Sequence, residues 1–163
     1  MSPTANPPIA GFGAVMNRIM ALIDLSEMTP AIVKVARDMA RAFNGELLLV
    51  HVIVPPSELS ESESRERDFP TGKDPRVHER QMDILKLTLI KEGINAVAVV
   101  VQAKRPGASP LEPILAKVAE LAPDLIIMGS HGHGRLHHLA GSATDTMVRR
   151  APCPVLIVPN RKG

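Results

Sequence analysis

A chain of 163 residues and 17.5 kDa is long enough for one domain with a full hydrophobic core and hardly long enough for two. The net charge of +2 and the absence of Trp and Tyr argue against nucleic acid or an anionic membrane as a partner. A single cysteine excludes an internal disulfide, and no apolar run approaches the roughly 20 residues of a membrane span. We therefore expect a cytoplasmic protein.

The first half of the chain begins with a tail and then alternates apolar and amphipathic segments. Residues 1–14 are rich in proline and small residues without a basic start, so we expect a disordered tail rather than a signal peptide, followed by one domain over 15–160. Residues 17–23 form a short apolar strand that ends at Asp24. Thr29 is expected to cap a helix, with Pro30 in its first turn, and Asn44-Gly45 to end it.

Residues 46–54 are almost continuously hydrophobic, as expected for a strand buried on both faces. Residues 55–73 mix Pro, Ser, Glu and Arg without periodicity, which predicts an exposed, mobile loop. Asp74-Pro75 then opens a helix that ends at Gly93. Its buried stripe is predicted to consist of Val77, Met82, Leu85 and Leu89.

The second half continues the alternation, with strands predicted at 95–102, 124–129 and 155–158. Ser109 and Glu112 have the spacing of a capping box for a helix that reaches about Leu121, and Ser142 is expected to cap a last helix over 142–150. Hydrophobic strands joined by helices predict a single-domain α/β fold, an open parallel sheet with helices on both faces. Ligands of such sheets bind beyond the carboxyl ends of the strands, where Asp24 and a glycine-rich loop are expected.

The glycine-rich loop follows the strand predicted at 124–129 and precedes the helix predicted at 142–150. Its backbone amides are left unshielded by side chains, and it ends at a helix N-terminus, an environment that favours a phosphate group. It lacks the lysine of a phosphate-binding P-loop, and His137 stands where the third glycine of a dinucleotide fingerprint would fall. The glycines concerned are Gly129, Gly132, Gly134 and Gly141.

The histidines and serines near the loop, and Cys153, each admit another interpretation. The histidines of the loop could bind metal, but their spacing fits no structural zinc site, which favours a solvated polar loop with weak affinity for nickel or zinc. A hydrolase would use Ser130 or Ser142 with a neighbouring histidine and Asp24 or Asp145, but no Gly-x-Ser-x-Gly elbow is present. Cys153, between two prolines, is expected to be a small core residue. The histidines are His131, His133, His137 and His138.

Three segments resemble the universal stress protein family. They are the first strand with its aspartate (19–27, IMALIDLSE), the second strand (48–53, LLVHVI) and the C-terminal stretch that ends RRAPCPVLIV at residue 158. The resemblance spans about residues 16–159. It implies a Rossmann-like fold of the adenine-nucleotide alpha hydrolase type, with a five-stranded parallel sheet of order 3-2-1-4-5. It also implies a homodimer formed through the C-terminal strand, residues 154–158.

The resemblance further implies ATP or another adenine nucleotide as ligand, with Mg²⁺ able to bridge the phosphates. Nucleotide-binding members carry the pattern Gly-x2-Gly-x9-Gly-Ser/Thr. Gly129, Gly132 and Gly141-Ser142 match it, except that the second spacer has eight residues instead of nine. Carried over by position, the adenosine pocket would consist of Leu22, Ile23, Asp24 and Val52. The ribose and phosphates would be held by Met128, Gly129, Gly132, His133, Gly141, Ser142 and Ala143.

The function implied by this resemblance is that of a dimeric stress-response sensor or regulator that binds an adenine nucleotide. No positioned base or arginine finger is recognisable, so no catalytic residue is expected and any ATP hydrolysis would be slow. One alternative is a nucleotide-free interaction protein whose shortened glycine loop has lost its ligand. Another is an enzyme that hydrolyses or transfers phosphate through Asp24 or Ser142.

Overall fold

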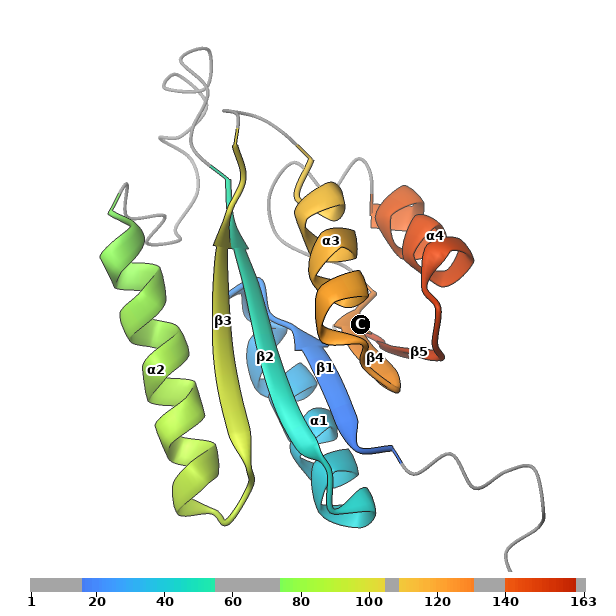
Figure 1. Ribbon diagram of the computed structural model, residues 1–163. Helices are drawn as coiled ribbons and strands as arrows, with labels where there is room; N and C mark the ends of the chain where they lie inside the picture. Colours follow the sequence, from blue (N-terminus) through green and yellow to red (C-terminus); the bar gives the residue numbers. More distant parts are fainter. Residues whose placement is uncertain (1–15, 55–73, 105–108, 131–139, 161–163) are drawn as a thin grey trace, which may run out of the picture.

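The computed structural model describes residues 16–54, 74–104, 109–130 and 140–160. They form a parallel five-stranded sheet of order β3-β2-β1-β4-β5 with helices on both faces (Figure 1), which confirms the predicted fold class. The sheet register pairs Leu22 of β1 with Val50 of β2, and Ala21 of β1 with Ile127 of β4. The elements are β1 (Arg18–Leu22), α1 (Thr29–Phe43), β2 (Glu46–Ile53), α2 (Pro75–Lys91), β3 (Ala96–Gln102), α3 (Leu111–Leu121), β4 (Leu125–Gly129), α4 (Ala140–Arg150) and β5 (Val155–Val158).

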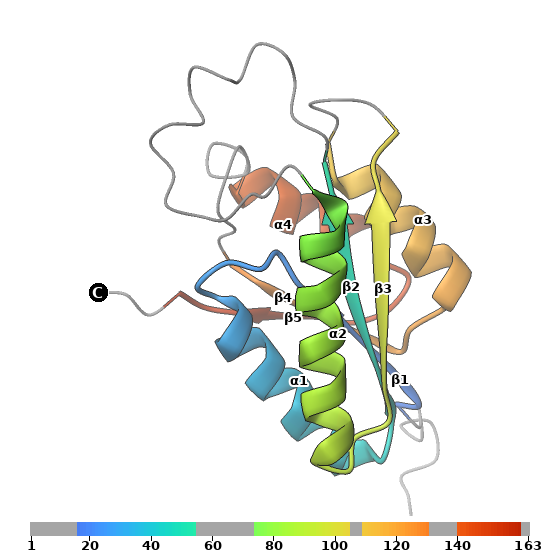
Figure 2. The same cartoon turned by 90° about the vertical axis from the view of Figure 1, so that its left-hand side faces the viewer.

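The two faces of the sheet are covered by different helix pairs, because side chains alternate along each strand. One face packs against α1 and α2, and the other packs against α3 and α4 (Figures 1 and 2). Both clusters are apolar, so the sheet is the centre of a three-layer core. The first cluster includes Ile19, Ala21, Leu47, Leu49, Ile127, Ile32 and Met82. The second includes Met20, Leu48, Val50, Ile126, Val118 and Met147.

The start of α1 differs from the prediction, because Thr29 does not cap the helix. Thr29 is the first helical residue, and its buried Oγ1 has no hydrogen-bond partner among the described residues. Met28 occupies the cap position without a side-chain cap, and Ser26 orders the turn before it: the Ser26 Oγ accepts from the amide of Met28 at 3.1 Å and its carbonyl from the amide of Thr29 at 3.0 Å. The sequence prediction was wrong by one residue, because Thr29 enters the helix and the turn formed by Ser26 takes the place of a side-chain cap.

Helix α2 begins as predicted, with the Asp74 carboxylate accepting from the amide of Arg76 at 3.0 Å. Met82 and Leu89 are fully buried, but Val77 is 38% exposed and does not belong to the buried stripe. Position 78 faces the sheet in its place, one residue along the helix. None of the described helices is long and apolar enough to cross a membrane.

The capping box predicted for α3 does not form. Pro110 occupies the cap position, and the Ser109 Oγ, one residue earlier, accepts from the amide of Leu111 at 3.2 Å and not from that of Glu112. Its carboxylate instead accepts from Arg150 of α4 at 2.8 Å and so joins the two helices of that face. Helix α4 begins at Ala140, so Ser142 lies inside its first turn and is not the capping residue.

The amino ends of the strands are joined to the preceding helices by tight turns. Asn44 ends α1 in the left-handed region, at φ 51°, and Gly45 follows directly. A Cβ at Gly45 would lie 2.5 Å from the carbonyl oxygen of Met16, so only glycine fits this position without movement of the backbone. Gly93 performs the equivalent turn after α2 with φ 83°.

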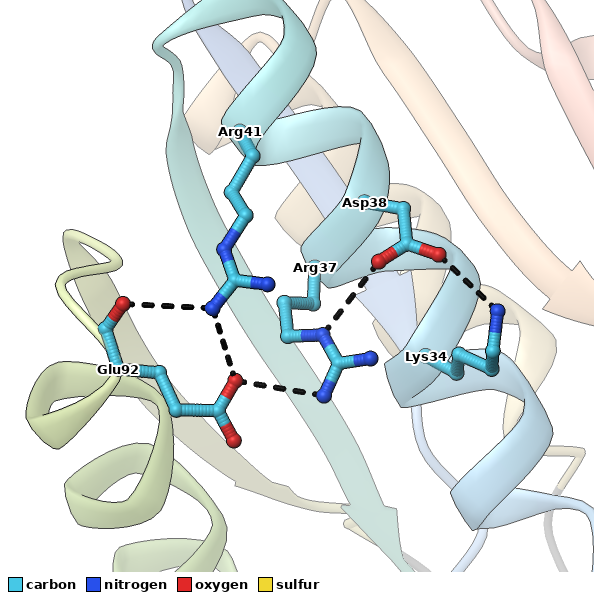
Figure 3. A network of polar contacts seen from close by, with 5 residues as sticks. All are labelled: Lys34, Arg37, Asp38, Arg41 and Glu92. Carbon is cyan, nitrogen blue, oxygen red and sulfur yellow. Dashed lines mark hydrogen bonds and ion pairs between the residues drawn. The ribbon is translucent and has the colours of Figure 1, made fainter.

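An exposed ion-pair network joins α1 to the end of α2 close to these turns (Figure 3). Arg37 and Arg41 approach the Glu92 carboxylate at 3.3 and 3.2 Å, and Arg41 also donates to the Glu92 carbonyl at 3.4 Å. On the other side of Arg37, the Lys34 ammonium and the Arg37 guanidinium hold the pKa of the Asp38 carboxyl below its ordinary value. Such exposed pairs contribute little to stability and are screened by salt.

Cys153 lies between α4 and β5 and packs against the α3–α4 side of the core. Its side chain is half-buried rather than fully enclosed. Burial raises the pKa of the thiol, and the negative charge of Asp124 raises it further. At neutral pH the thiol is therefore protonated and behaves as a small apolar group, as the sequence predicted.

Candidate functional site

The strands that carry the two predicted loops are direct neighbours. Residues 19–21 of β1 pair with residues 125–127 of β4, while β1 continues through α1 to β2 on its other side. The strand order therefore reverses between β1 and β4, which is where ligands of open parallel sheets bind. Asp24 follows the carboxyl end of β1, and Gly129 is the last residue of β4. The two segments singled out in the sequence thus leave the sheet side by side.

The turn after β1 is strained and held by several hydrogen bonds. Leu25 has φ 57°, a left-handed conformation that is unfavourable for a bulky side chain. The Oδ1 atom of Asp24 accepts from the amide of Ser26 at 3.0 Å. Ser26 is itself buried and orders the first turn of α1. The backbone around Asp24 is therefore fixed, and its carboxylate is anchored through one oxygen.

Two residues predicted for the adenosine pocket, Leu22 and Val52, and one predicted for the ribose and phosphates, Met128, occupy one face of the sheet. Leu22 and Met128 are half-buried and pack against the α3–α4 side of the core, at the ends of neighbouring strands. Val52, also half-buried, is two residues beyond Val50, so the alternation of β2 places it on the same face. Together they offer an apolar surface next to the switch point.

Ile23 is placed differently from these residues. Its side chain is 3% exposed and belongs to the opposite core, against α1 and α2. Its amide donates to the carbonyl of Val50 at 2.8 Å, so the backbone is tied to β2. The structure therefore leaves Ile23 a role in positioning Asp24 and no side-chain surface for a ligand.

The glycine-rich side of the site is described only at its two ends. Ser130 donates its amide to the carbonyl of Val158 at 2.9 Å, and its Oγ accepts from the amide of Asn160 at 3.0 Å. Gly132 and His133 lie outside the described residues, as do His131, His137, His138 and Gly134. Gly141 and Ser142 belong to the first turn of α4, where backbone N–H groups have no partner within the helix. Ala143 follows them and is half-buried.

His51 is a site residue that the sequence analysis missed. It is 4% exposed on β2, and its Nδ1 lies 2.6 Å from the carbonyl oxygen of Ile23, directly before Asp24. Its Nε2 lies 2.8 Å from Nδ1 of His78, in the first turns of α2. Burial lowers the pKa of His51, against the opposing effects of the Ile23 carbonyl and of Asp24. A lone polar residue in the apolar run LLVHVI was the available signal.

The described residues of the arrangement offer binding chemistry. The Ser130 hydroxyl, one candidate nucleophile, accepts a backbone hydrogen bond from the residues after β5. Across the described part of the chain, no group of three or more His, Cys, Asp or Glu side chains could hold a metal ion. The features present are an apolar surface, an anchored carboxylate and a helix N-terminus, whose first amides have no partner within the helix; these suit a ligand with a ring and an anionic group.

Comparison with known proteins decides the family. The model of the universal stress protein family matches residues 16–159, which is nearly the whole chain. The chain belongs to this family. A curated universal stress protein of Thermus aquaticus is 30% identical over 142 residues, covering 86% of this chain and 96% of that protein. Universal stress protein A homolog 1 of Coxiella burnetii is 28% identical over 141 residues, covering 86% and 94%.

Solved structures of universal stress proteins share the fold. One, in complex with cAMP, has a TM-score of 0.62 at 18% identity and covers 88% of this chain and 97% of its own. Another, from Archaeoglobus fulgidus in complex with dAMP, has a TM-score of 0.58 at 18% identity and covers 87% and 96%. At these identities the likeness establishes the fold of this universal stress protein, and the ligands are properties of those two proteins.

Proposed function

We propose that this universal stress protein binds an adenine nucleotide at the carboxyl ends of β1 and β4 and acts as a dimeric regulator. The observation that carries the proposal is the pairing of β1 with β4, which brings the Asp24 turn beside the strand that leads into the glycine-rich loop. The complexes of two structural relatives with cAMP and dAMP support an adenine nucleotide as the ligand class.

In the proposed complex each part of the site has one task. The adenine ring lies on the apolar surface of Leu22, Val52 and Met128. Asp24 has Oδ1 engaged by Ser26 and uses Oδ2 to accept from a ribose hydroxyl or the adenine amine. The amides of Gly129, Gly141, Ser142 and Ala143, with Gly132 and His133 of the loop, hold the ribose and phosphates. Mg²⁺, where required, is bound mainly by the phosphates themselves.

Dimerisation is proposed through β5, the edge strand of the sheet next to β4. Its four residues form an apolar run, VLIV, and an apolar edge left unpaired is prone to association. A symmetric contact between two copies of 154–158 would satisfy both edges. Light scattering on purified protein measures the mass directly, and a monomer at micromolar concentration would contradict the dimer.

The nucleotide proposal is tested first on untagged protein. Heat-released ligand is identified by mass spectrometry, and ATP and cAMP are titrated into nucleotide-free protein. The variant Asp24→Asn keeps a carbonyl for the Ser26 amide but loses the charge, so we expect roughly tenfold or greater weakening. Asp38→Asn, an exposed aspartate on α1, is the matched control and should bind like wild type.

Two results would decide against the proposal. Absence of a released nucleotide, together with no binding at millimolar ATP or cAMP, would leave a nucleotide-free interaction protein. The one-residue-shorter spacer between Gly132 and Gly141 would then be the explanation. Equal binding by the Asp24 and Asp38 variants would instead place the ligand elsewhere.

A further inference from the structure

The pair formed by buried His51 and half-buried His78, next to the site, has a defined pattern of protons. The carbonyl oxygen of Ile23 only accepts hydrogen bonds, so Nδ1 of His51, 2.6 Å away, must carry a proton. In a neutral His51, Nε2 is then the acceptor, and Nδ1 of His78, 2.8 Å away, must donate. The two ring planes are inclined by only 23°, which suits an in-plane N–H···N bond. Two hydrogen bonds in series therefore run from α2 to the peptide group before Asp24.

We propose that His51 is a positioning residue for Asp24, and that His78 holds it in place only while the pair carries no more than one positive charge. This inference rests on the nucleotide site proposed above. His51 fixes the orientation of the Ile23–Asp24 peptide plane through the Ile23 carbonyl, and the amide of Ile23 is already fixed by Val50. The backbone that carries the ligand-binding carboxylate therefore depends on a ring held at both of its nitrogens.

The pair can take one proton without losing a bond, but not two. A proton on Nε2 of His78 leaves its Nδ1–H free to donate to His51. A second proton must go to Nε2 of His51, where two N–H groups would then face each other at 2.8 Å and two cations would lie side by side. The His51–His78 bond must break at that point.

The surroundings oppose the second charge. Burial and the neighbouring His78 lower the pKa of His51, whereas the Ile23 carbonyl and the Asp24 carboxylate act to raise it. Among the described residues, the ionisable side chains that act on His51 are those of His78, from α2, and Asp24, after the end of β1. Within the described residues, β3 presents apolar Val100 as register partner, and the buried face of α1 has no ionisable side chain.

A doubly protonated His51 is stable only if it reaches water, since an isolated buried cation is costly. From a position 4% exposed, this requires either the ring to turn out or the first turns of α2 to move away. Either movement takes the Nδ1–H from the Ile23 carbonyl and loosens the turn that carries Asp24. The expected result is a nucleotide affinity that falls as the pH drops below about 6.5, the ordinary pKa of histidine.

The test measures cAMP binding from about pH 8 to about pH 5, because this phosphodiester lacks the second ionisation that ATP has in this range. Wild type should lose up to about tenfold in affinity per pH unit below about pH 6.5, where a His51 ring that reaches water takes up a proton and the buried ring does not. The variants His51→Asn and His78→Asn place an untitratable amide N–H close to the position of each Nδ1, so each should bind at pH 8 with a flatter pH profile. His51→Leu lacks the donor and should bind weakly at every pH.

A second measurement follows the turn without any nucleotide. Hydrogen exchange of the Ser26 and Met28 amides, corrected for intrinsic pH dependence, should show protection falling by up to about eightfold between pH 7 and pH 5.5 in wild type. His78→Asn should lose much less protection over this range. If His78 only packed against its neighbours and had no role in positioning, its loss would lower protection equally at both pH values.

The outcomes separate the inference from the proposed function. No cAMP or ATP binding by wild type at pH 8 would refute the nucleotide site, and the exchange measurement would then decide whether the pair controls the turn. Binding at pH 8 with the same pH profile in wild type and both asparagine variants would overturn the inference alone. Full affinity of His51→Leu at pH 8 would overturn the positioning role of His51.

Discussion

Left-handed residues occur at both ends of the sheet, but they do different things there. At the amino ends of the strands, Asn44 and Ala122 directly follow α1 and α3, and Gly93 follows α2 after one residue, Glu92. Their amides donate back into the helix they end, to Arg41, Ile90 and Val118 at 3.4, 2.9 and 3.0 Å. The unfavourable backbone conformation is thus part of an ordinary helix C-cap, which satisfies carbonyl groups that would otherwise lack partners.

Leu25, at the carboxyl end of β1, has the same backbone conformation without that compensation. It follows a strand, not a helix, and it carries a bulky side chain at φ 57°. What surrounds it is a set of polar contacts that fix Asp24: Ser26 on one side and His51 on the other. The contrast indicates that strain at the amino ends serves the fold, whereas strain at the carboxyl end serves presentation of a carboxylate.

The largest effect expected from this contrast is at Gly45, an amino-end position. Gly45→Ala places a Cβ 2.5 Å from the backbone oxygen of Met16, and we expect a loss of about 1–3 kcal/mol of unfolding free energy. Urea denaturation measures the loss, and nucleotide affinity of the folded protein should not change. Gly93→Ala is the control: it has open space around it and only its positive φ to strain, about 1 kcal/mol. A larger loss at Gly93 would contradict the steric argument.

The corresponding change at the carboxyl end is Ser26→Ala. It leaves the buried Met28 amide without its acceptor, and we expect a loss of about 1–2 kcal/mol together with weaker nucleotide binding, because the Asp24 turn loosens. Ser109→Ala removes an equivalent but exposed contact at the start of α3 and should leave binding unchanged. Calorimetry and nucleotide titration on both variants test the difference. Unchanged binding in Ser26→Ala would uncouple the turn from the site.

A gain in stability is expected at the third amino-end cap. Ala122 has φ 44° and is exposed, so Ala122→Gly removes a strained Cβ and should stabilise the protein by up to about 1 kcal/mol. The same replacement at Ala116, exposed in the interior of α3, should instead cost about 1 kcal/mol. Thermal unfolding of both variants makes the comparison, and a loss at Ala122 would show that the cap is not strained.

The smallest effect is expected in the ion-pair network of Figure 3. Glu92→Gln should lower stability by about 0.2–1 kcal/mol at low salt, and the difference from wild type should fade at high salt. Glu120→Gln, which removes a contact to Lys117 within α3 alone, serves as the control and should cost less. An effect of Glu92→Gln that persists in high salt would mean that the carboxylate has a structural role beyond charge.

The sequence predicted the fold well because strands buried on both faces have a pattern that few other structures share. The run over 46–54 and the run over 155–158 match β2 and β5 to within one residue. The helix starts were predicted less well. Met28 and not Thr29 occupies the cap position of α1, and α4 begins at Ala140, before Ser142, because capping depends on the path by which the chain enters the helix. Val77 was misplaced for a related reason, since α2 is turned so that the neighbouring His78 faces β2.

The sequence predicted where the site lies, but it did not predict the buried contacts that hold the site residues in place. Asp24 and Gly129 could be placed because parallel strands end at a common edge and β1 and β4 are neighbours. His51 and His78 stand 27 residues apart, in different elements, and no local spacing links them. Their contact exists only because α2 packs on the face of the sheet that carries His51. Residue roles inside the glycine-rich loop, including those of Gly132 and His133, stay predictions.

The position of Cys153 has a practical consequence for following this molecule in solution. It is the sole thiol in the chain, and it lies half-buried where α4 leads into β5. Because its pKa is raised and its side chain is half-buried, the thiol should react slowly with a maleimide or disulfide reagent in the folded protein. The reaction should quicken if α4 moves away from β5. The unmodified protein therefore carries its own single-site reporter, and labelling rates with and without ligand would time the opening of α4 from β5 without introducing any substitution.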